Sequence, residues 1–177
     1  MACTSVTLNG VTLDCGNVGG LKSVWIADKL DVSGLTYTSG EITAITMVTS
    51  KKFKKFEFRK GNANFVSTST RNDANGTVFV DTTLTMNFNY METVKRNDMI
   101  ALTKANTYVI VKDNNNKYWF IGYDTNTDGY VGGSVNANSG AAMGDANNYV
   151  VTLTAQTAEL PLEVVSGVMT TTIVDKL

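Results

Sequence analysis

The sequence predicts an all-β fold, a β-barrel or sandwich with one flanking helix. Threonine (25 residues) and asparagine (18) account for 43 of the 177 residues, and threonine favours strands whereas asparagine favours turns. Hydrophobic residues make up 43% of the chain, which is enough for a core. The segment Thr77–Tyr90 alternates apolar and polar side chains with the period of two that is typical of a strand.

That alternating segment is unusually long. At about 3.3 Å per residue it would span roughly 45 Å, so we expect it to need a barrel wall or a partner chain along its length. The helix is expected directly after it, over 91–104, because Met99 and Leu102 share one helical face and Asn89 can cap it. The other expected strands are 21–27, 41–49, 53–60, 107–112, 117–122, 149–157, 160–165 and 168–174, with loops at 30–40 and 124–148.

We expect a single domain over residues 1–177, since no linker or change of composition divides the chain. A hairpin is expected over about 1–18, where Cys3 and Cys15 could face each other as thiols or as a disulfide. The last residues, about 166–177, are expected to form a strand or an arm. No secretory signal or membrane-spanning stretch is expected, and therefore no membrane insertion.

The composition argues against an enzyme. The chain has no histidine, so it cannot contain a Ser-His-Asp or Cys-His nucleophile, and its two cysteines cannot complete a closed zinc site. No pair of carboxylates has a spacing that indicates acid–base catalysis. We expect no catalytic residue and no cofactor.

A weak calcium-loop candidate lies at Asp124, Asn126 and Asp128. These oxygen ligands, followed by Gly129, match the first half of a calcium loop. Val135 stands where the second half requires a bidentate glutamate. The alternative is a turn rich in asparagine and aspartate.

Residues 51–60 carry six basic side chains and one acidic one, a local charge of +5 that leaves −6 on the rest of the chain. One interpretation is contact with an acidic patch of a second subunit. Another is an edge strand protected by lysines, and a third is binding of single-stranded nucleic acid, which the net charge of −1 disfavours. The candidates for inter-subunit contact are Lys51, Lys52, Lys54 and Lys55.

The polar face of the long strand carries mainly threonine and asparagine. It is either the solvated side of a sheet or the wall of a lumen, wetted but without the positive charge that would hold phosphates. The candidates for lumen-facing residues are Thr83, Thr85 and Asn87.

The order of these elements resembles that of phage tail tube proteins, particularly the tube-like structural proteins of phages that infect Bacteroidetes. The resemblance covers most of the chain. It is carried by Cys3, Cys15 and Gly19-Gly20, the 62–90 passage, the 91–104 helix, the 109–123 hairpin, and the 139–154 segment from Ser139-Gly140 through Asp145-Ala-Asn-Asn-Tyr149.

The resemblance implies a barrel or sandwich of tail-tube type with long inter-subunit loops, such as 30–40 and 50–55. It further implies a hexameric ring that stacks into a tube, through which double-stranded genome DNA passes transiently. The protein would be made in the host cytoplasm, reside in the virion tail and contact other tail or neck proteins. The alternatives are a capsid-decorating or head–tail connector protein, and a carbohydrate-binding β-sandwich, which the tryptophans and the 124–128 turn would favour.

Overall fold

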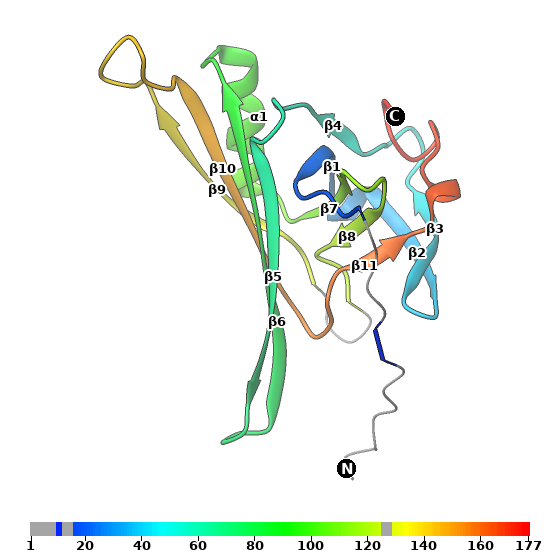
Figure 1. The fold of residues 1–177 in the computed structure, drawn as a ribbon. Coiled ribbons are helices and arrows are strands. Elements are labelled where there is room, and N and C mark those ends of the chain that lie inside the picture. The colour runs from blue at the N-terminus through cyan, green and yellow to red at the C-terminus, as the bar shows by residue number, and fades with distance from the viewer. Residues whose placement is uncertain (1–9, 12–15, 125–128) are drawn as a thin grey trace.

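The computed structural model describes residues 10–11, 16–124 and 129–177, and within them the chain is mostly β with a single α-helix. Two sheets pack against each other, and the helix lies behind the smaller one (Figure 1). The larger sheet has the strand order β2-β3-β11-β8-β7-β1-β4, and the smaller sheet has the order β5-β6-β10-β9. The expected all-β fold with one helix is confirmed.

The larger sheet consists of β1 (Leu21–Asp28), β2 (Val32–Thr38), β3 (Glu41–Met47), β4 (Lys54–Phe56), β7 (Thr107–Asp113), β8 (Tyr118–Ile121) and β11 (Leu162–Val164). The smaller sheet consists of β5 (Ala63–Asn72), β6 (Thr77–Asn89), β9 (Gly132–Asn138) and β10 (Asn148–Thr157). The helix α1 covers Thr93–Lys104, and short 3-10 helices occupy Lys29–Asp31 (η1) and Ser166–Val168 (η2).

The central strands of the larger sheet are buried on both faces. On β1, Val24 and Ile26 contribute to the core shared with the smaller sheet, whereas Trp25 contributes to a second core on the opposite side. This second core is closed by β3, β11 and the C-terminal residues Met169, Ile173 and Val174. Burial on both faces explains why the β7–β8 hairpin reads as a nearly continuous apolar run.

The long alternating strand expected over Thr77–Tyr90 is confirmed by β6, which covers Thr77–Asn89. Leu84 and Met86 are fully buried in the core between the sheets. Thr82 interrupts the apolar series, and its hydroxyl lies 2.8 Å from that of Ser67 on β5, which satisfies a polar group that is only 2% exposed. The side chains at alternate positions point away from the core.

Two expected loops contain strands that were not predicted. Residues 30–40, expected to be a loop, form η1 and the strand β2, which pairs with β3. The 124–148 stretch contains β9, and β5 precedes β6 in the 62–90 passage. These three strands lie at the edges of the sheets, where one side lacks a strand partner and the apolar pattern is weak.

Three other expectations are wrong. Of the 53–60 segment only β4 is a strand, and it pairs with β1 instead of the preceding strand. The expected strand 168–174 is absent: Val168 ends η2, and residues 169–174 lie over the second core with a turn and a single β-bridge, between Phe53 and Val174. The helix begins after Glu92, without the side-chain cap expected from Asn89.

Candidate assembly surface

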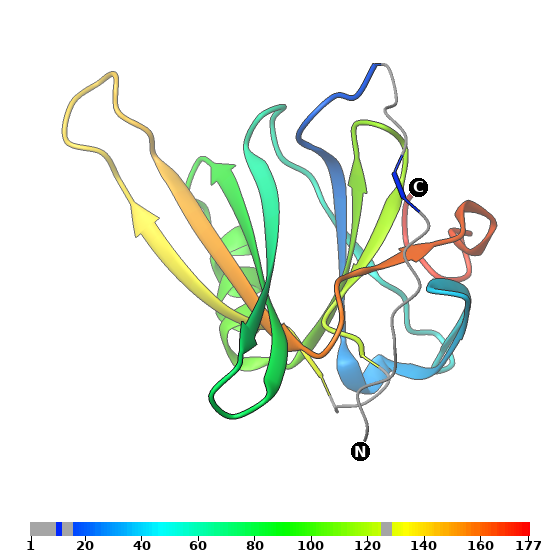
Figure 2. The ribbon, with the colours of Figure 1, turned by 60° about the horizontal axis from the view of Figure 1, so that its bottom comes forward.

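One face of the smaller sheet is open, because the larger sheet and α1 both pack on the other face (Figures 1 and 2). The three residues predicted to face a lumen, Thr83, Thr85 and Asn87, lie together on this open face, opposite the buried positions of β6. Of the described residues of these four strands that point to it, Asp81 is the only charged one. Val66, Phe79 and Val150 are apolar. Most of the rest are polar and uncharged: Asn64, Thr68 and Thr70 on β5, Thr83, Thr85, Asn87 and Asn89 on β6, Ser134, Asn136 and Asn138 on β9, and Asn148, Thr152, Thr154 and Gln156 on β10.

Asparagine is concentrated at one end of this open face. Asn148 of β10 is paired with Asn89 of β6 on one side and with Asn138 of β9 on the other. The Oδ1 atoms of Asn87 and Asn148 are buried without a hydrogen-bond partner. These amides line the end of the open face that lies next to the β9–β10 loop.

The two edges of the smaller sheet are unprotected. The ladders β5–β6 and β10–β9 have no bulge, and apart from them no backbone-to-backbone hydrogen bond among the described residues involves β5 or β9. β9 contains no charged residue, and β5 contains only Arg71. Proteins normally protect such edges with lysine, proline, bulges or very short strands, because a free edge invites another chain to pair.

The edges of the larger sheet show the protection that the smaller sheet lacks. β4 has only three residues, and two of them are Lys54 and Lys55. β2 pairs with β3 through two register irregularities. Since one chain contains both kinds of edge, the open edges of the smaller sheet are a specific feature of that sheet.

The strand directions permit the two open edges to pair with each other in neighbouring copies. The pairs β5–β6, β6–β10 and β10–β9 are all antiparallel, so β5 and β9 run in opposite directions. If β9 of one copy were placed beside β5 of a second, the alternation would continue without interruption. A rotation that repeats this contact closes a ring.

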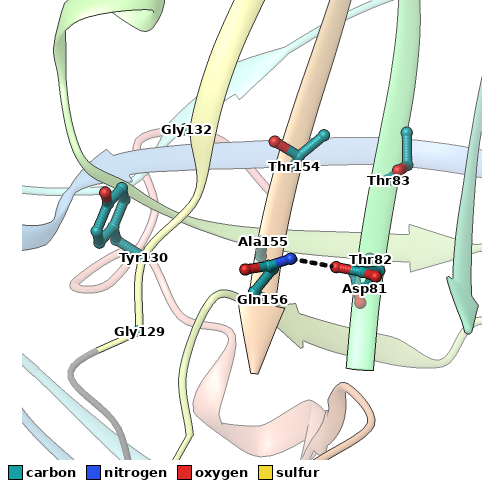
Figure 3. A pocket seen from close by; sticks show the side chains of 9 residues that line it. All are labelled: Asp81, Thr82, Thr83, Gly129, Tyr130, Gly132, Thr154, Ala155 and Gln156. Carbon is teal, nitrogen blue, oxygen red and sulfur yellow. Dashed lines mark hydrogen bonds between the residues drawn. The ribbon is translucent and has the colours of Figure 1, made fainter. Parts of the chain in front are cut away.

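A shallow depression of about 710 Å³ lies on the open face where β9 begins (Figure 3). Gly132 pairs with Thr154, and beyond this pair β10 has no ladder partner among the described residues on that side. Gln156 donates a hydrogen bond of 2.9 Å to Asp81 at the floor of the depression, and the half-exposed Tyr130 stands at its rim. The depression is therefore a polar surface pocket at the point where the pairing of β9 with β10 ends.

The four lysines proposed for inter-subunit contact have partners within the same chain. Lys51 pairs with Asp31 at 3.1 Å, and Lys54 lies 3.9 Å from Asp175. The Nζ atoms of Lys52 and Lys55 donate to the backbone carbonyls of Thr171 and Leu177. Three of the four thus contact the C-terminal segment, and all four lie near β4, on the larger sheet.

The calcium candidate lies largely outside the described residues, which exclude Asn126 and Asp128. The carboxylate of Asp124 is buried and accepts a hydrogen bond of 2.6 Å from the backbone N–H of Ala158. Among the described residues, no group of three or more cysteine, aspartate or glutamate side chains could hold a metal ion. The hairpin expected over about 1–18, with Cys3 and Cys15, also falls mostly outside the described part of the chain.

The aromatic residues that a sugar site would need are largely in the core. Trp25 is 2% exposed, and its Nε1 donates a hydrogen bond of 2.7 Å to the carbonyl of Lys176. Trp119 donates from Nε1 to Asp113, and Tyr108 is buried against Phe120. Buried rings cannot stack on a sugar, so Trp25 and Tyr108 are not accessible to one, whereas Trp119 is half-buried.

Comparison of the chain with known protein families, with curated proteins and with solved structures found no match. In the described part of the chain, no helix has both the length and the apolar character needed to span a membrane. The inference of function therefore depends on the surface of the smaller sheet.

Proposed function

We propose that the protein is a virion structural protein without enzymatic activity, a tail-tube or tube-like subunit that forms stacked rings. The observation that carries this proposal is the smaller sheet, whose open face is polar and whose two edges are unprotected and antiparallel to each other. In the ring, β9 of each copy pairs with β5 of the next. The contact removes every free edge of that sheet, as in a closed barrel.

The dimensions of such a ring suit the passage of a double helix. Four strands from each of six copies, spaced about 4.8 Å apart and tilted by about 40°, give a barrel circumference of about 150 Å. This circumference corresponds to a diameter of roughly 48 Å between backbones, and side chains that reach about 5 Å inward leave a bore of roughly 38 Å. The bore is wider than duplex DNA, and the duplex keeps its hydration.

The chemistry of the open face suits a wall that DNA passes without binding. Hydroxyl and amide groups such as those of Thr83, Thr85 and Asn87 hold water at the surface. Affinity for the DNA backbone comes mainly from lysine and arginine that displace counterions, and no such residue points from the four strands to this face. The lysines near β4 are on the larger sheet, which lies outside the bore.

The test is the oligomeric state of the purified protein. Mass photometry and negative-stain electron microscopy should show rings of uniform size with a central pore, stacked into tubes at higher concentration. A strictly monomeric protein at high concentration would refute the proposal. Rings that never stack, located at the neck of the virion by immunogold labelling, would indicate a head–tail connector instead.

A further inference from the structure

The smaller sheet ends in two projecting hairpin tips that point in opposite directions (Figure 1). β6 pairs with β10 from Asn89 to Val80, and the β5–β6 hairpin continues three residue pairs beyond this overlap to its turn at 73–76. The β9–β10 loop, residues 139–147, projects from the other end, next to Asn89. In a ring formed through the edges of this sheet, one set of tips would lie on each rim.

The β9–β10 tip presents one fully exposed methionine on a braced loop. The carboxylate of Asp145 accepts hydrogen bonds from the backbone N–H groups of Ala141 (2.9 Å) and Ala142 (2.8 Å), and Met143 between these residues and Asp145 is entirely exposed. Gly140 has a φ of +72°, and a Cβ there would lie 2.7 Å from the Cβ of Asp145. The loop is therefore held in one shape, which reduces the entropy lost when Met143 binds a partner.

The β5–β6 tip presents a complementary surface without net charge. Val78 is 53% exposed, and it lies on the same face of the hairpin as Arg71, its partner on β5. Arg71 and Asp73 neutralise each other at a distance of 2.6 Å. An apolar side chain that approaches this face of the hairpin end meets Val78 and a neutralised ion pair.

We propose that Met143 of one copy packs against Val78 of a copy in the next ring, so that the two hairpin tips form the axial contact of the tube. This inference rests on the proposed ring. A second copy of the chain is the natural occupant, because the two hairpins that carry the tips also carry the two open edges. Ring closure therefore arrays one set of tips on each rim.

A single contact of this size is weak, since stable interfaces bury over 1,000 Å² or so in total. Several identical contacts made at once by two rings act multivalently. We therefore expect stacking only after rings have closed. Because the contact is apolar, raising the salt concentration should not dissolve the stacks.

The test compares stacking and ring formation in the same samples. Met143→Asp and Val78→Asp should each leave the number of rings unchanged in mass photometry and reduce stacked rings at least tenfold in electron micrographs. The matched control is Val18→Asp, the same substitution at a position that is 55% exposed beside Asn115 of the larger sheet's β7–β8 turn, which should stack like the original protein. Circular dichroism should be unchanged, since all three side chains are exposed.

A charge pair tests the contact directly. Met143→Lys combined with Val78→Asp should restore stacking, and this restored stacking should fall as salt is raised. Normal stacking in Met143→Asp would overturn the axial contact while leaving the ring proposal intact. Absence of rings in the original protein would refute the ring proposal itself, so the two failures are distinguishable.

Discussion

Like charges placed on both edges of the smaller sheet should prevent ring closure without unfolding the chain. Asn64 on β5 and Ser134 on β9 are exposed and lie in one row of the open face, connected through Thr85 and Thr152. Three strand spacings of about 4.8 Å separate the two ends of the row by about 14 Å within one copy. This separation exceeds the Debye length of about 8 Å at physiological salt, so lysines at both positions barely interact within the monomer.

Across the proposed seam the same lysines would come together. Side chains that face each other on neighbouring strands are about 5 Å apart. Two positive charges at that distance repel by about 1 kcal/mol in water and by about 3 kcal/mol at an effective dielectric constant of 20. Summed over the six seams of a hexameric ring, the repulsion is about 6 to 20 kcal/mol.

The variant should carry two lysines on each edge, because barrel closure staggers the rows of neighbouring strands. Asn64→Lys with Val66→Lys on β5, and Ser134→Lys with Asn136→Lys on β9, meet this requirement. Mass photometry should show monomers at physiological salt and partial recovery of rings at 1 M salt or so, where the Debye length is about 3 Å. Thermal denaturation should show that the chain still folds.

The matched control keeps the lysines on β9 and places aspartates at the two β5 positions, Asn64 and Val66. Opposite charges then face each other across every seam, and rings should form at physiological salt. If the variant with lysine on both edges forms rings as readily as this control, β5 does not pair with β9 and the proposed ring is wrong.

Three further predictions concern the fold and the tip. Phe53→Ala should lower the free energy of unfolding by about 3–5 kcal/mol, because its ring is fully buried, and a loss below about 1 kcal/mol in chemical denaturation would contradict this. Gly133→Ala should cost about 1–3 kcal/mol, since the added Cβ would lie 2.9 Å from the carbonyl oxygen of Leu102, whereas Gly144→Ala has open space and should change nothing. Backbone hydrogen bonds lower the pKa of Asp145 below its ordinary value of 3.8, so its bracing of the tip is complete above that pH and is lost as the pH falls through the lowered pKa. A carboxyl titration by NMR that gave an apparent pKa of 3.8 or higher would contradict this bracing.

The parts of the fold that could be predicted from the sequence are those whose side chains report burial directly. β6 was predicted because successive residues from Val80 to Phe88 point alternately to the buried core and to the solvent. β7 and β8 were predicted because both of their faces are buried. In each case hydrophobicity along the chain reflects the environment of the strand.

The edge strands β2, β5 and β9 could not be predicted, because the side chains of these strands do not show the pattern of a strand. β9 contains Gly132-Gly133, which reads as a turn. Gly133 is glycine because Leu153 and the carbonyl of Leu102 leave no room for a Cβ. β5 contains mainly serine, threonine and asparagine over its last six residues, and it is a strand because it pairs with the length of β6.

The candidate surface was predicted in part. Thr83, Thr85 and Asn87 were assigned to one polar face from the period of two, and the structure places them there. Their cross-strand neighbours, such as Asn64 and Thr152, could not be found without the register of the sheet. The partners of the lysines were also out of reach, because Asp175 and Thr171 are more than a hundred residues from them in sequence and meet them only through the fold.

The four strands of the smaller sheet carry little charge, both on the open face and along the two edges. A solvated face needs only polarity, and lysine or glutamate would satisfy it as well as threonine or asparagine. A stable monomer would gain from lysine on the edges, as β4 shows for the larger sheet. Solvation of a face and stability of a monomer therefore do not explain why charge is nearly absent from the face and from both edges at once. In the proposed ring, pairing of the edges between copies would keep charge out of the seams, and passage of DNA would keep positive charge off the wall, so the proposal accounts for the absence of lysine and arginine from both.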